Sequence, residues 1–507
     1  MKNTRKRFTG IASVILVLSL ILSACSGASE KSVTNEGSAN EKGLGTNVSS
    51  TTAEPYELTY AVMSTGPTDD AKLVEEEISK ITKEKINVTV KLEFIGGSQW
   101  TQQTNLMLSG NEKLDLIMTN AYINHYSGQV SRGQIIAIDD LLVQYGQGIQ
   151  EVLEKDVIDA TRIDGKLYGI PRVGGLSVAF GFLGRQDLID QYQIDMTQVK
   201  IWSDLGSVFQ AIKDNDPKII PVTKGAMTPA IATISDKFDV FGDSLGVMDI
   251  RNNKLEVINL FETEDYRDAI ALVHGWYKAG YIQKDLATSQ IEGNSVVEAG
   301  QAFGSFGTIF PGVEAATTEQ YGYPSIVIQL SQPISFTNNA SGFMTSIAKN
   351  SKNPEKAMEF LNLLYTDKEI MNLLALGIEG KHYVKKEGDT IVPAEGPPTY
   401  MFNNWQQGNN AMVYPTEGSD PEIWAKIKEF DSLAVKPSTF GFTFDPTPVK
   451  TEIAAATNVL NSYRAGLENG VVDPSKLNEF NSKLKTAGLD KIIAEKQKQL
   501  DAWAATK

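Results

Sequence analysis

The chain has 507 residues, one cysteine, three histidines and a formal net charge of −15 at pH 7. This acidity, with no block of Lys and Arg beyond the N-terminus, excludes the basic surface that phosphate recognition needs, so we expect no nucleic-acid partner. One cysteine cannot build a disulfide framework, and roughly 450 residues beyond the N-terminal segments favour two lobes held by their cores alone.

Residues 1–24 have the pattern of an export signal. An apolar stretch at 11–22 follows a basic start made of Lys2, Arg5, Lys6 and Arg7. Twelve helical residues rise only about 18 Å, against roughly 30 Å of hydrocarbon, so we expect cleavage rather than a membrane span. Loss of these four cations would change the net charge from −15 to −19.

The only cysteine lies where that apolar stretch ends. Leu22-Ser23-Ala24-Cys25 matches the lipobox of bacterial lipoproteins, which predicts a lipidated Cys25 as the first mature residue. The alternative is a chance cysteine beside an ordinary cleavage site. Two acyl chains suffice for stable anchoring, which places the protein on the outer face of the cytoplasmic membrane. Residues 25–55 contain almost nothing large and apolar and are expected to form a flexible tether with a reach on the order of 30 Å.

The first folded segments alternate between strand and helix patterns. We expect strands at 56–64, 87–97 and 114–119, the last as a buried parallel strand. Helices are expected at 66–86, with acids first and lysines last, and at 100–109, with Gly110 as the stop. This alternation predicts an α/β layer fold.

Helices are expected to dominate the second half of the chain. Residues 246–260 read as two short strands about Asn252-Asn253. Tyr266, Ala269, Ile270, Val273 and Tyr277 follow the spacing of an amphipathic helix that Gly280 would close, and Ala357, Phe360, Leu361 and Leu364 form a second stripe. Further helices are expected at 447–470, after the Asp473-Pro474 cap, and from Leu489 onward.

Most catalytic signatures are missing from the sequence. His125, His274 and His382 lack metal-site spacing, and no GxSxG, P-loop or GxGxxG pattern occurs, so we expect no metal and no cofactor. The acids at 75–77 and 139–140 read as solvated helix faces. A glycosidase, however, needs only two carboxylates at a separation that sequence does not reveal.

Aromatic side chains in glycine-rich or polar loops are the better functional candidates. Sugar rings stack their C–H faces on aromatic rings, while their hydroxyls need fixed polar partners. The alternative for each residue is that it fills a core or pins a loop. The candidates are Trp100, Tyr122, Tyr168, Phe303, Phe306, His382, Tyr383 and Trp405.

The order of these features resembles the family 1 extracellular solute-binding lipoproteins of bacterial ABC importers, in the branch associated with oligosaccharides. "DGKLYGIPR" at 164–172 looks like the strand that first crosses between lobes, and "AFGSFG" at 302–307 looks like a turn that meets the ligand. "NPEKAMEFLNLLYTD" at 353–367 looks like the helix after the return crossing. The segment from 441 is similar to a C-terminal extension of large lipoproteins.

The resemblance implies an α/β, two-lobe periplasmic-binding-protein-like (type II) fold with a hinge and an interlobe cleft. Lobe one would comprise 56–172 and 325–350, and lobe two 173–324 and 351–507 with the helical extension. By position, Asn120 and Tyr122 would face Ser305 and Phe306 across the cleft, with Phe444 at its floor. Few tryptophans lie in the cleft segments, which disfavours a glucan.

As implied by the family, the protein would be a non-enzymatic monomer that captures a solute, most often an oligosaccharide, and delivers it to ABC permease subunits. A peptide or another polar solute is an alternative cargo. Two other functions stay open from the sequence. One is a lipid-anchored envelope glycan hydrolase or lyase, and the other is a sensing lipoprotein without transport.

Overall fold

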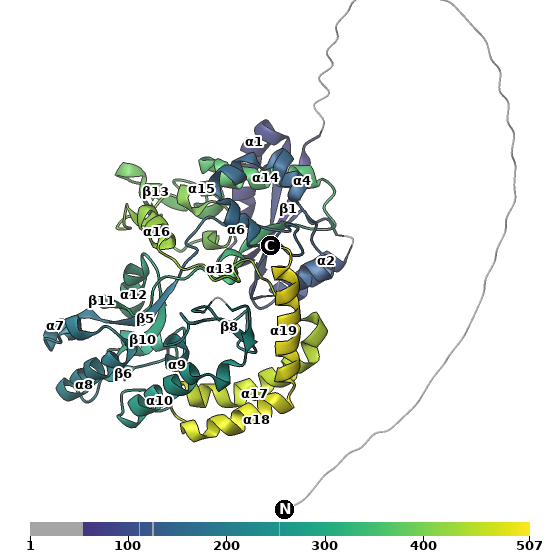
Figure 1. The fold of residues 1–507 in the computed structure, drawn as a ribbon. Coiled ribbons are helices and arrows are strands. Elements are labelled where there is room, and N and C mark those ends of the chain that lie inside the picture. Colours follow the sequence, from purple (N-terminus) through teal and green to yellow (C-terminus); the bar gives the residue numbers. More distant parts are fainter. Residues whose placement is uncertain (1–53, 111, 124–125, 253) are drawn as a thin grey trace, which may run out of the picture. The chain divides into compact units, whose positions relative to one another are not determined.

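The computed structural model describes residues 54–110, 112–123, 126–252 and 254–507. The predicted signal, Cys25 and all but the last residues of the predicted tether lie outside the described residues, as does His125. The described chain contains a five-stranded and a four-stranded sheet, each with its own hydrophobic core (Figure 1). This confirms the predicted α/β fold with two lobes.

Lobe one is built on the five-stranded sheet, in the order β2-β1-β3-β12-β4. β1 runs parallel to β2 and β3, whereas β12 runs antiparallel to β3 and β4. β1 and β3 are buried along most of their length, as near-continuous apolar strands should be. The strands are Tyr56–Ser64 (β1), Val88–Gly96 (β2), Leu116–Thr119 (β3), Ile170–Pro171 (β4) and Met344–Ile347 (β12).

Helices from two distant parts of the chain cover this sheet (Figure 1). α1 buries Val74 and Ile78 and ends at Asn87, which adopts a left-handed conformation with φ +53°. A hairpin of β13 (Tyr383–Lys385) and β14 (Ile391–Pro393) follows α15. The helices are Ala71–Ile86 (α1), Trp100–Ser109 (α2), Tyr126–Ser131 (α3), Asp139–Tyr145 (α4), Gln147–Val152 (α5), Lys155–Asp159 (α6), Pro354–Thr366 (α14) and Lys368–Leu376 (α15).

Lobe two is built on the four-stranded sheet, in the order β11-β5-β10-β6. β5 pairs antiparallel with both β10 and β11, and β6 runs parallel to β10. A small antiparallel sheet β7-β8-β9 confirms the two short strands expected within 246–260. The strands are Ala179–Arg185 (β5), Ile220–Val222 (β6), Phe238–Asp239 (β7), Val247–Asp249 (β8), Val257–Ile258 (β9), Ala302–Ile309 (β10) and Ser325–Gln329 (β11).

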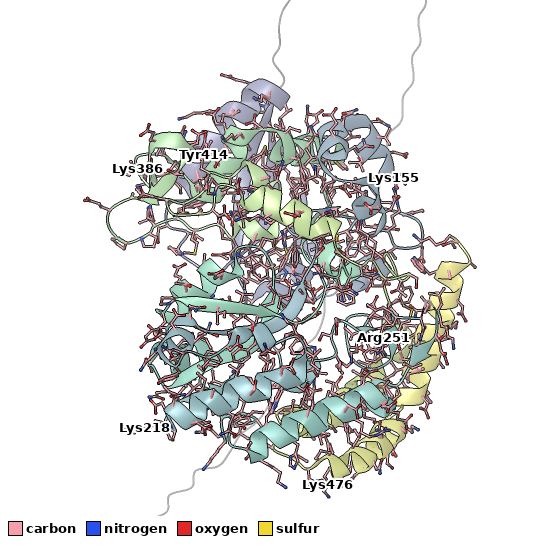
Figure 2. The ribbon with its side chains drawn as sticks, turned by 60° about the vertical axis from the view of Figure 1, so that its left-hand side comes forward. Lys155, Lys218, Arg251, Lys386, Tyr414 and Lys476 are labelled. Atoms are coloured by element: carbon pink, nitrogen blue, oxygen red, sulfur yellow. The ribbon has the colours of Figure 1, made fainter. Side chains whose placement is uncertain are left out.

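The helices of lobe two include the three C-terminal ones, which share its core. In α10 the expected stripe is buried, although Trp276 rather than Tyr277 completes it. The helices are Gln186–Gln191 (α7), Leu205–Asn215 (α8), Pro229–Ala232 (α9), Glu264–Lys278 (α10), Gly293–Glu298 (α11), Val313–Tyr321 (α12), Lys450–Glu468 (α17), Leu477–Thr486 (α18) and Leu489–Ala504 (α19). Charged side chains such as Lys218 and Lys476 lie on the outside (Figure 2).

Three segments of the chain cross between the lobes side by side. Residues 172–178 lead from β4 to β5, residues 330–343 lead from β11 to β12, and residues 433–446 lead into the C-terminal helices. Ile334 forms isolated bridges to Val178 on one side and to Val435 on the other. Two short helices adjoin these crossings, Thr337–Ala340 (α13) and Ile423–Ser432 (α16). The boundaries expected from the sequence also imply three crossings, but they put the third at 350–351, whereas it lies at 433–446 and brings the C-terminal extension back to lobe two.

The predicted domain boundaries are therefore wrong in two places. Residues 325–329 form β11, which hydrogen-bonds to β5 in lobe two rather than belonging to lobe one. α14 and α15 lie in the core of lobe one, because the apolar stripe that includes Phe360 packs on β1, with the rings of Tyr60 and Phe360 at 6.4 Å. Tyr400 and Phe402 join the same core, so lobe one extends well beyond residue 350.

The segment "AFGSFG" is a central strand, not a turn. It forms most of β10, between β5 and β6. A Cβ at residue 304 would lie 2.0 Å from the carbonyl oxygen of Leu183, so glycine there allows the close approach of two strands. The glycines that suggest a turn are needed here because the neighbouring strand leaves no room for a side chain.

Short 3₁₀ turns occupy several connections. Among the described residues, no helix is long and apolar enough to cross a bilayer. The 3₁₀ turns are Met196–Gln198, Trp202–Asp204, Leu260–Glu262, Glu387–Asp389, Asn404–Gln406, Asn410–Met412, Thr447–Val449 and Pro474–Lys476.

Candidate functional site

A cavity of about 870 Å³ lies between the lobes, beside the crossing segments. Its volume falls within the range of about 300–1,000 Å³ common for ligand pockets. Lobe one contributes Asn404 and Trp405, lobe two contributes Thr308 and Phe310, and α16 contributes Trp424 and Ile427 from a third side. The cavity therefore has walls from both lobes, as a cleft that closes on a ligand requires.

Two exposed aromatic rings face this cavity from lobe one. Trp405 is 45 % exposed, and its ring stands edge-on to Phe343 with centroids 4.8 Å apart. Tyr122 is 55 % exposed, and its hydroxyl donates to the backbone oxygen of Asn338 at 3.2 Å. Each ring is held at one edge or end while its remaining surface stays open, so both can stack on a sugar ring.

The loop that carries Tyr122 is shaped by the residue before it. Asn120 is buried directly after β3, and its Oδ1 accepts hydrogen bonds from the backbone N–H of Tyr122, at 2.9 Å, and of Ile123. Asparagine side chains commonly fix such turns. Asn120 therefore positions the loop and does not itself line the cavity.

Arg172, the first residue of the first crossing segment, places a cation in the lining of this cavity. Its guanidinium has no hydrogen bond or ion pair to any described residue, although Asp431 and two tyrosines surround it. A Cβ at residue 174 would lie 1.5 Å from its Nη1, so Gly174 leaves the space that the guanidinium fills. Desolvation lowers the pKa of Arg172 below its usual value. Its five N–H donors are available to ligand oxygens.

Asn410 adds a polar atom to the same wall. Its Nδ2 donates to the backbone oxygen of Val173 at 3.0 Å, which leaves the buried Oδ1 without a hydrogen-bond partner among the described residues. A buried acceptor of this kind is costly unless something donates to it. Together, Arg172 and Asn410 offer donors and an acceptor beside the two aromatic rings.

A smaller cavity of about 370 Å³ adjoins the first on the lobe-two side. The two share Tyr122, Val178, Thr308, Asn338 and Asn339 in their linings. The walls of the smaller cavity are mostly apolar side chains from α9, β7 and the loop after β7. The cleft is therefore branched.

Of the predicted site residues, Tyr122 and Trp405 line the main cavity. Phe444 lines a separate cavity of about 260 Å³ at the third crossing, where its backbone oxygen accepts from the Ser127 hydroxyl at 3.3 Å. Phe444 thus lies at a contact between lobe one and the C-terminal extension. Phe444 was expected at the floor of the ligand cleft, but it does not line the main cavity.

Three other predicted aromatics are core residues. Trp100, the first residue of α2, is buried in a core cluster of lobe one, and Phe303 and Phe306 are buried in the core of lobe two. Phe306 packs on the rings of Phe182 and Trp276, at 5.1 and 5.9 Å. β10 is a central strand that is buried along almost its whole length, so both phenylalanine rings meet apolar neighbours rather than solvent. Ser305 is also buried, within 3.2 Å of the Tyr321 hydroxyl.

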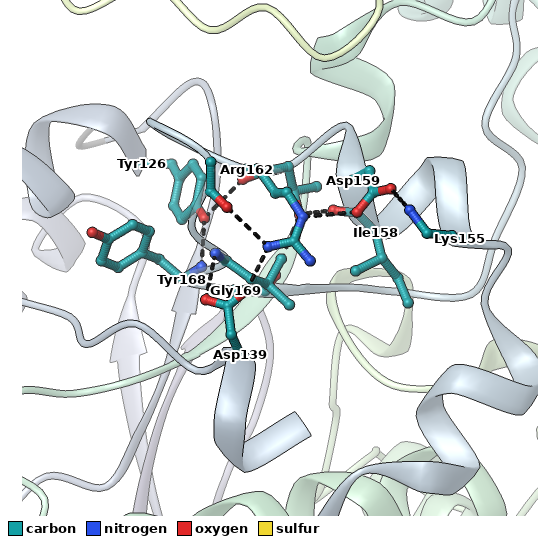
Figure 3. A network of polar contacts seen from close by, with 11 residues as sticks. Tyr126, Asp139, Lys155, Ile158, Asp159, Arg162, Tyr168 and Gly169 are labelled. Atoms are coloured by element: carbon teal, nitrogen blue, oxygen red, sulfur yellow. Dashed lines mark hydrogen bonds and ion pairs between the residues drawn. The ribbon is translucent and has the colours of Figure 1, made fainter. Parts of the chain in front are cut away.

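Tyr168 belongs to a polar network in lobe one (Figure 3). Its backbone N–H donates to the Tyr126 hydroxyl at 3.2 Å. Arg162 forms ion pairs with Asp139 at 2.5 Å and with Asp159 at 2.7 Å in the same network. Asp139 is thus a structural anchor rather than the solvated residue expected, and Tyr168 lies outside the cavity linings described above.

His382 and Tyr383 lie at the outer side of lobe one. His382 Nδ1 accepts from the Ile378 N–H at 2.8 Å, so its Nε2 carries the proton and faces Asp70 at 3.2 Å. Tyr383 is buried in β13. Neither lines the main cavity, although Asp389 in the turn between β13 and β14 does.

The carboxylates in the main cavity all have partners. Asp431 accepts from the backbone N–H of Leu176 with both oxygens at 3.2 Å, and Asp420 pairs with Lys426 at 2.5 Å. Asp389 pairs with Lys368 at 3.1 Å. Among the described residues, no group of three His, Cys, Asp or Glu side chains is placed to hold a metal ion.

The comparisons with known proteins agree with this geometry. A model of the bacterial extracellular solute-binding protein family matches residues 65–371, more than half of the chain. The chain belongs to this family. Residues 438–505 of this solute-binding protein also match a domain of unknown function, DUF3502, which corresponds to the predicted C-terminal extension.

Two curated relatives within this range of similarity have more specific names. The solute-binding protein is 28% identical over 449 residues to a carbohydrate ABC transporter substrate-binding protein of Streptococcus pneumoniae serotype 4 (strain ATCC BAA-334 / TIGR4), covering 85% of this chain and 87% of the relative. It is 25% identical over 361 residues to lipoprotein LipO of Bacillus subtilis (strain 168), covering 67% of each.

A solved structure matches over nearly the whole described chain. The N-glycan transport solute binding protein (NgtS) from Streptococcus pneumoniae matches with a TM-score of 0.78 and 26% identity, covering 88% of this chain and 98% of that one. Its complex with Man1GlcNAc matches with a TM-score of 0.69 and 25% identity, covering 88% and 99%. These matches confirm the two-lobe solute-binding fold.

Sequence reasoning missed Arg172 and Asn410. Arg172 is the last residue of "DGKLYGIPR", which was singled out as a crossing strand. Asn410 directly follows "FNNWQQGN", which was singled out for Trp405. A single arginine after a Pro has no periodicity that marks it as a ligand contact. A usable signal was the density of amide side chains at 403–410, which is unusual for a plain surface loop.

Proposed function

We propose that this solute-binding protein is the substrate-binding component of a carbohydrate ABC importer and that it captures an oligosaccharide between its lobes. The observation that carries the proposal is the branched interlobe cleft, in which two open aromatic rings lie beside an unpaired guanidinium. The carbohydrate substrate-binding relative and the N-glycan transport relative, each covered over most of its length, support it.

The chemistry of the cleft suits a sugar chain. Trp405 and Tyr122 offer flat apolar surface for the C–H faces of sugar rings, and Arg172 and Asn410 offer polar groups for hydroxyls. Such a site binds without breaking a bond. The carboxylates of the main cavity are engaged by backbone, lysine or both, so none is presented as a free acid and base pair.

The three crossing segments provide the hinge in this proposal. Ser177 and Ser335 join the first two through a hydrogen bond of 2.7 Å, and the backbone N–H of Ser335 donates to the oxygen of Val435 in the third at 3.0 Å. Ligand contacts with both lobes favour the closed state over the open one. The closed form then docks on the permease subunits, and a separate ATPase supplies the energy.

The proposed location is the outer face of the cytoplasmic membrane, with a lipid on Cys25. The lipobox at 22–25 and the polar stretch after it support this anchor, and the relative named lipoprotein LipO agrees with it. The acyl chains hold the protein at the bilayer while the tether lets the lobes reach the permease.

Calorimetry on the chain from residue 26 onward tests the proposal. Oligosaccharides of the Man–GlcNAc type are titrated beside xylan, pectic and glucan fragments. We expect one class to bind with one site per chain, to raise the melting temperature and to be recovered unchanged. Release of a shorter product would indicate an enzyme, and binding of peptides but of no glycan would contradict the carbohydrate assignment.

A further inference from the structure

The side cavity of the cleft is partly built by the C-terminal segment that matches a domain of unknown function. Arg464, from α17, lines this cavity opposite apolar side chains that include Met227, Ile231 and Val240. No other charged side chain except Asp239 lines it. The cavity therefore combines an apolar wall with one guanidinium and one carboxyl group.

Only part of that guanidinium is engaged by the protein. Arg464 Nε donates to both oxygens of Glu468, at 2.9 and 2.8 Å. Its two terminal amino groups have no hydrogen bond or ion pair among the described residues, and its side chain is 35 % exposed. Four N–H donors are therefore left for a group inside the cavity.

The charge of Arg464 is nevertheless neutralised. Glu468 is completely buried and accepts from the hydroxyls of Thr228 and Tyr266 as well, at 2.7 and 3.4 Å. Burial raises the pKa of Glu468, while the Arg464 guanidinium and the two hydroxyls that donate to it favour its carboxylate form. Asp239 adds a second acid to the wall, with its oxygens turned to the Thr439 hydroxyl and the Phe241 N–H. A ligand anion would meet no net positive field here.

We propose that this side cavity binds a neutral acyl group of the ligand, as the acetamido group of an N-acetylated amino sugar presents. The methyl group would contact the apolar wall, and the carbonyl oxygen would accept from the free amino groups of Arg464. This inference rests on the proposed function, because the side cavity opens into the interlobe cleft. It gives the C-terminal segment a role in ligand selection.

The same segment also fixes the loop that forms the cavity wall. Lys496 of α19 is fully buried, with Nζ 2.6 Å from Asp243 Oδ1 and 3.1 Å from the Gly246 oxygen. Thr439 holds Asp239 at the other end of this loop, at 2.6 Å. The wall at 239–246 therefore forms polar contacts with the C-terminal segment at both ends. These contacts fix the position of the wall and so the shape of the cavity.

The experiment compares three disaccharides that differ at one group. Mannosyl-N-acetylglucosamine, mannosyl-glucose and mannosyl-glucuronic acid are titrated by calorimetry into the chain from residue 26 onward. We expect the N-acetylated sugar to bind about tenfold tighter than mannosyl-glucose, since it adds a hydrogen bond to a charged donor and a buried methyl group. Equal binding would overturn the side-cavity inference and leave the proposed function standing. Tighter binding of the uronic acid would overturn the neutral-acyl assignment, and no binding of any glycan would overturn both.

Two variants locate the preference. Val240→Phe fills the cavity from a wall position that is 37 % exposed, and Val143→Phe, at a 65 % exposed position on α4, is its matched control. Arg464→Gln combined with Glu468→Gln removes the guanidinium while keeping the pair neutral, and the melting temperature of this variant reports whether its fold is kept. We expect both cavity variants to bind the two neutral disaccharides equally and the control to keep the tenfold difference. A preference retained in both cavity variants, with unchanged melting temperatures, would overturn the inference.

Discussion

The ring of Trp405 stands at 81° to the ring of Phe343, with centroids 4.8 Å apart. This edge-to-face contact holds the tryptophan in place while 45 % of the residue stays exposed at the cleft, so little ordering of the side chain is needed on binding. Trp405→Ala and Tyr122→Ala should each weaken oligosaccharide binding about tenfold, because stacking surface is lost. The melting temperature of the free protein should change by no more than about 2 °C.

Leu106→Ala is the control for these two variants, since Leu106 of α2 is also an exposed apolar residue but lies outside the crossing segments and does not line the main cavity. Calorimetry gives the affinities and differential scanning fluorimetry the melting temperatures. Affinity unchanged in Trp405→Ala and Tyr122→Ala would remove both rings from the proposed site.

Phe306→Ala should behave in the opposite way. Its ring is buried against Phe182, Trp276 and Phe209, so truncation leaves a cavity in the core of lobe two. We expect a loss of about 3–5 kcal/mol in the free energy of unfolding. Denaturant titration measures it. Phe306→Leu, which keeps most of the volume, should cost clearly less, and a small loss for Phe306→Ala would argue against the core placement.

Arg172→Met should reduce affinity without reducing stability. The guanidinium is desolvated and has no hydrogen-bonded partner among the described residues, so its replacement removes an uncompensated charge. We expect oligosaccharide affinity to fall about tenfold while the melting temperature stays equal or rises. Arg162→Met makes the contrast, because Arg162 is ion-paired to Asp139 and Asp159 away from the cleft. That variant should lose stability and keep its affinity.

Asp70 should contribute a stability that is lost only in strong acid. Hydrogen bonds from the Thr399 hydroxyl, Lys381 and His382 lower the pKa of Asp70 to about 2, from an ordinary value near 3.8. A carboxylate with a depressed pKa stabilises the fold above its unfolded-state pKa, and this stabilisation disappears as the pH falls through the folded-state value. The difference in unfolding free energy between the wild type and Asp70→Asn should be constant above about pH 5 and should shrink between about pH 4 and pH 2. A pH-independent difference would contradict this account.

Cys25→Ser should release the full-length protein from membranes. The thiol is the atom that a lipobox prepares for acylation, and no apolar segment in the rest of the chain is expected to span a bilayer. Fractionation of expressing cells, with immunodetection of the membrane and soluble fractions, measures the change. Ser23→Thr keeps Cys25 and serves as the control. A Cys25→Ser chain that stays with the membrane would refute the anchor.

Much of the local structure was predictable because it depends on neighbours in the sequence. The apolar run at 56–64 is β1 residue for residue, and the stripe from Tyr266 to Val273 is the buried face of α10. Such elements follow from periodicity and end signals alone. The family resemblance gave "AFGSFG" as a turn, since sequence similarity does not show that its glycines face neighbouring strands rather than solvent.

The sequence by itself determined the alternation that makes an α/β fold, the missing catalytic motifs and the family, and it predicts the export signal. Tertiary structure alone decided which aromatics are ligand candidates: Trp405 and Tyr122 are open, whereas Trp100 and Phe306 are covered by segments remote in the chain. It also decided that β11 belongs to lobe two and that α17 supplies Arg464 to the cleft. The physical reason is that burial and pairing depend on long-range contacts, which residue type and spacing do not record.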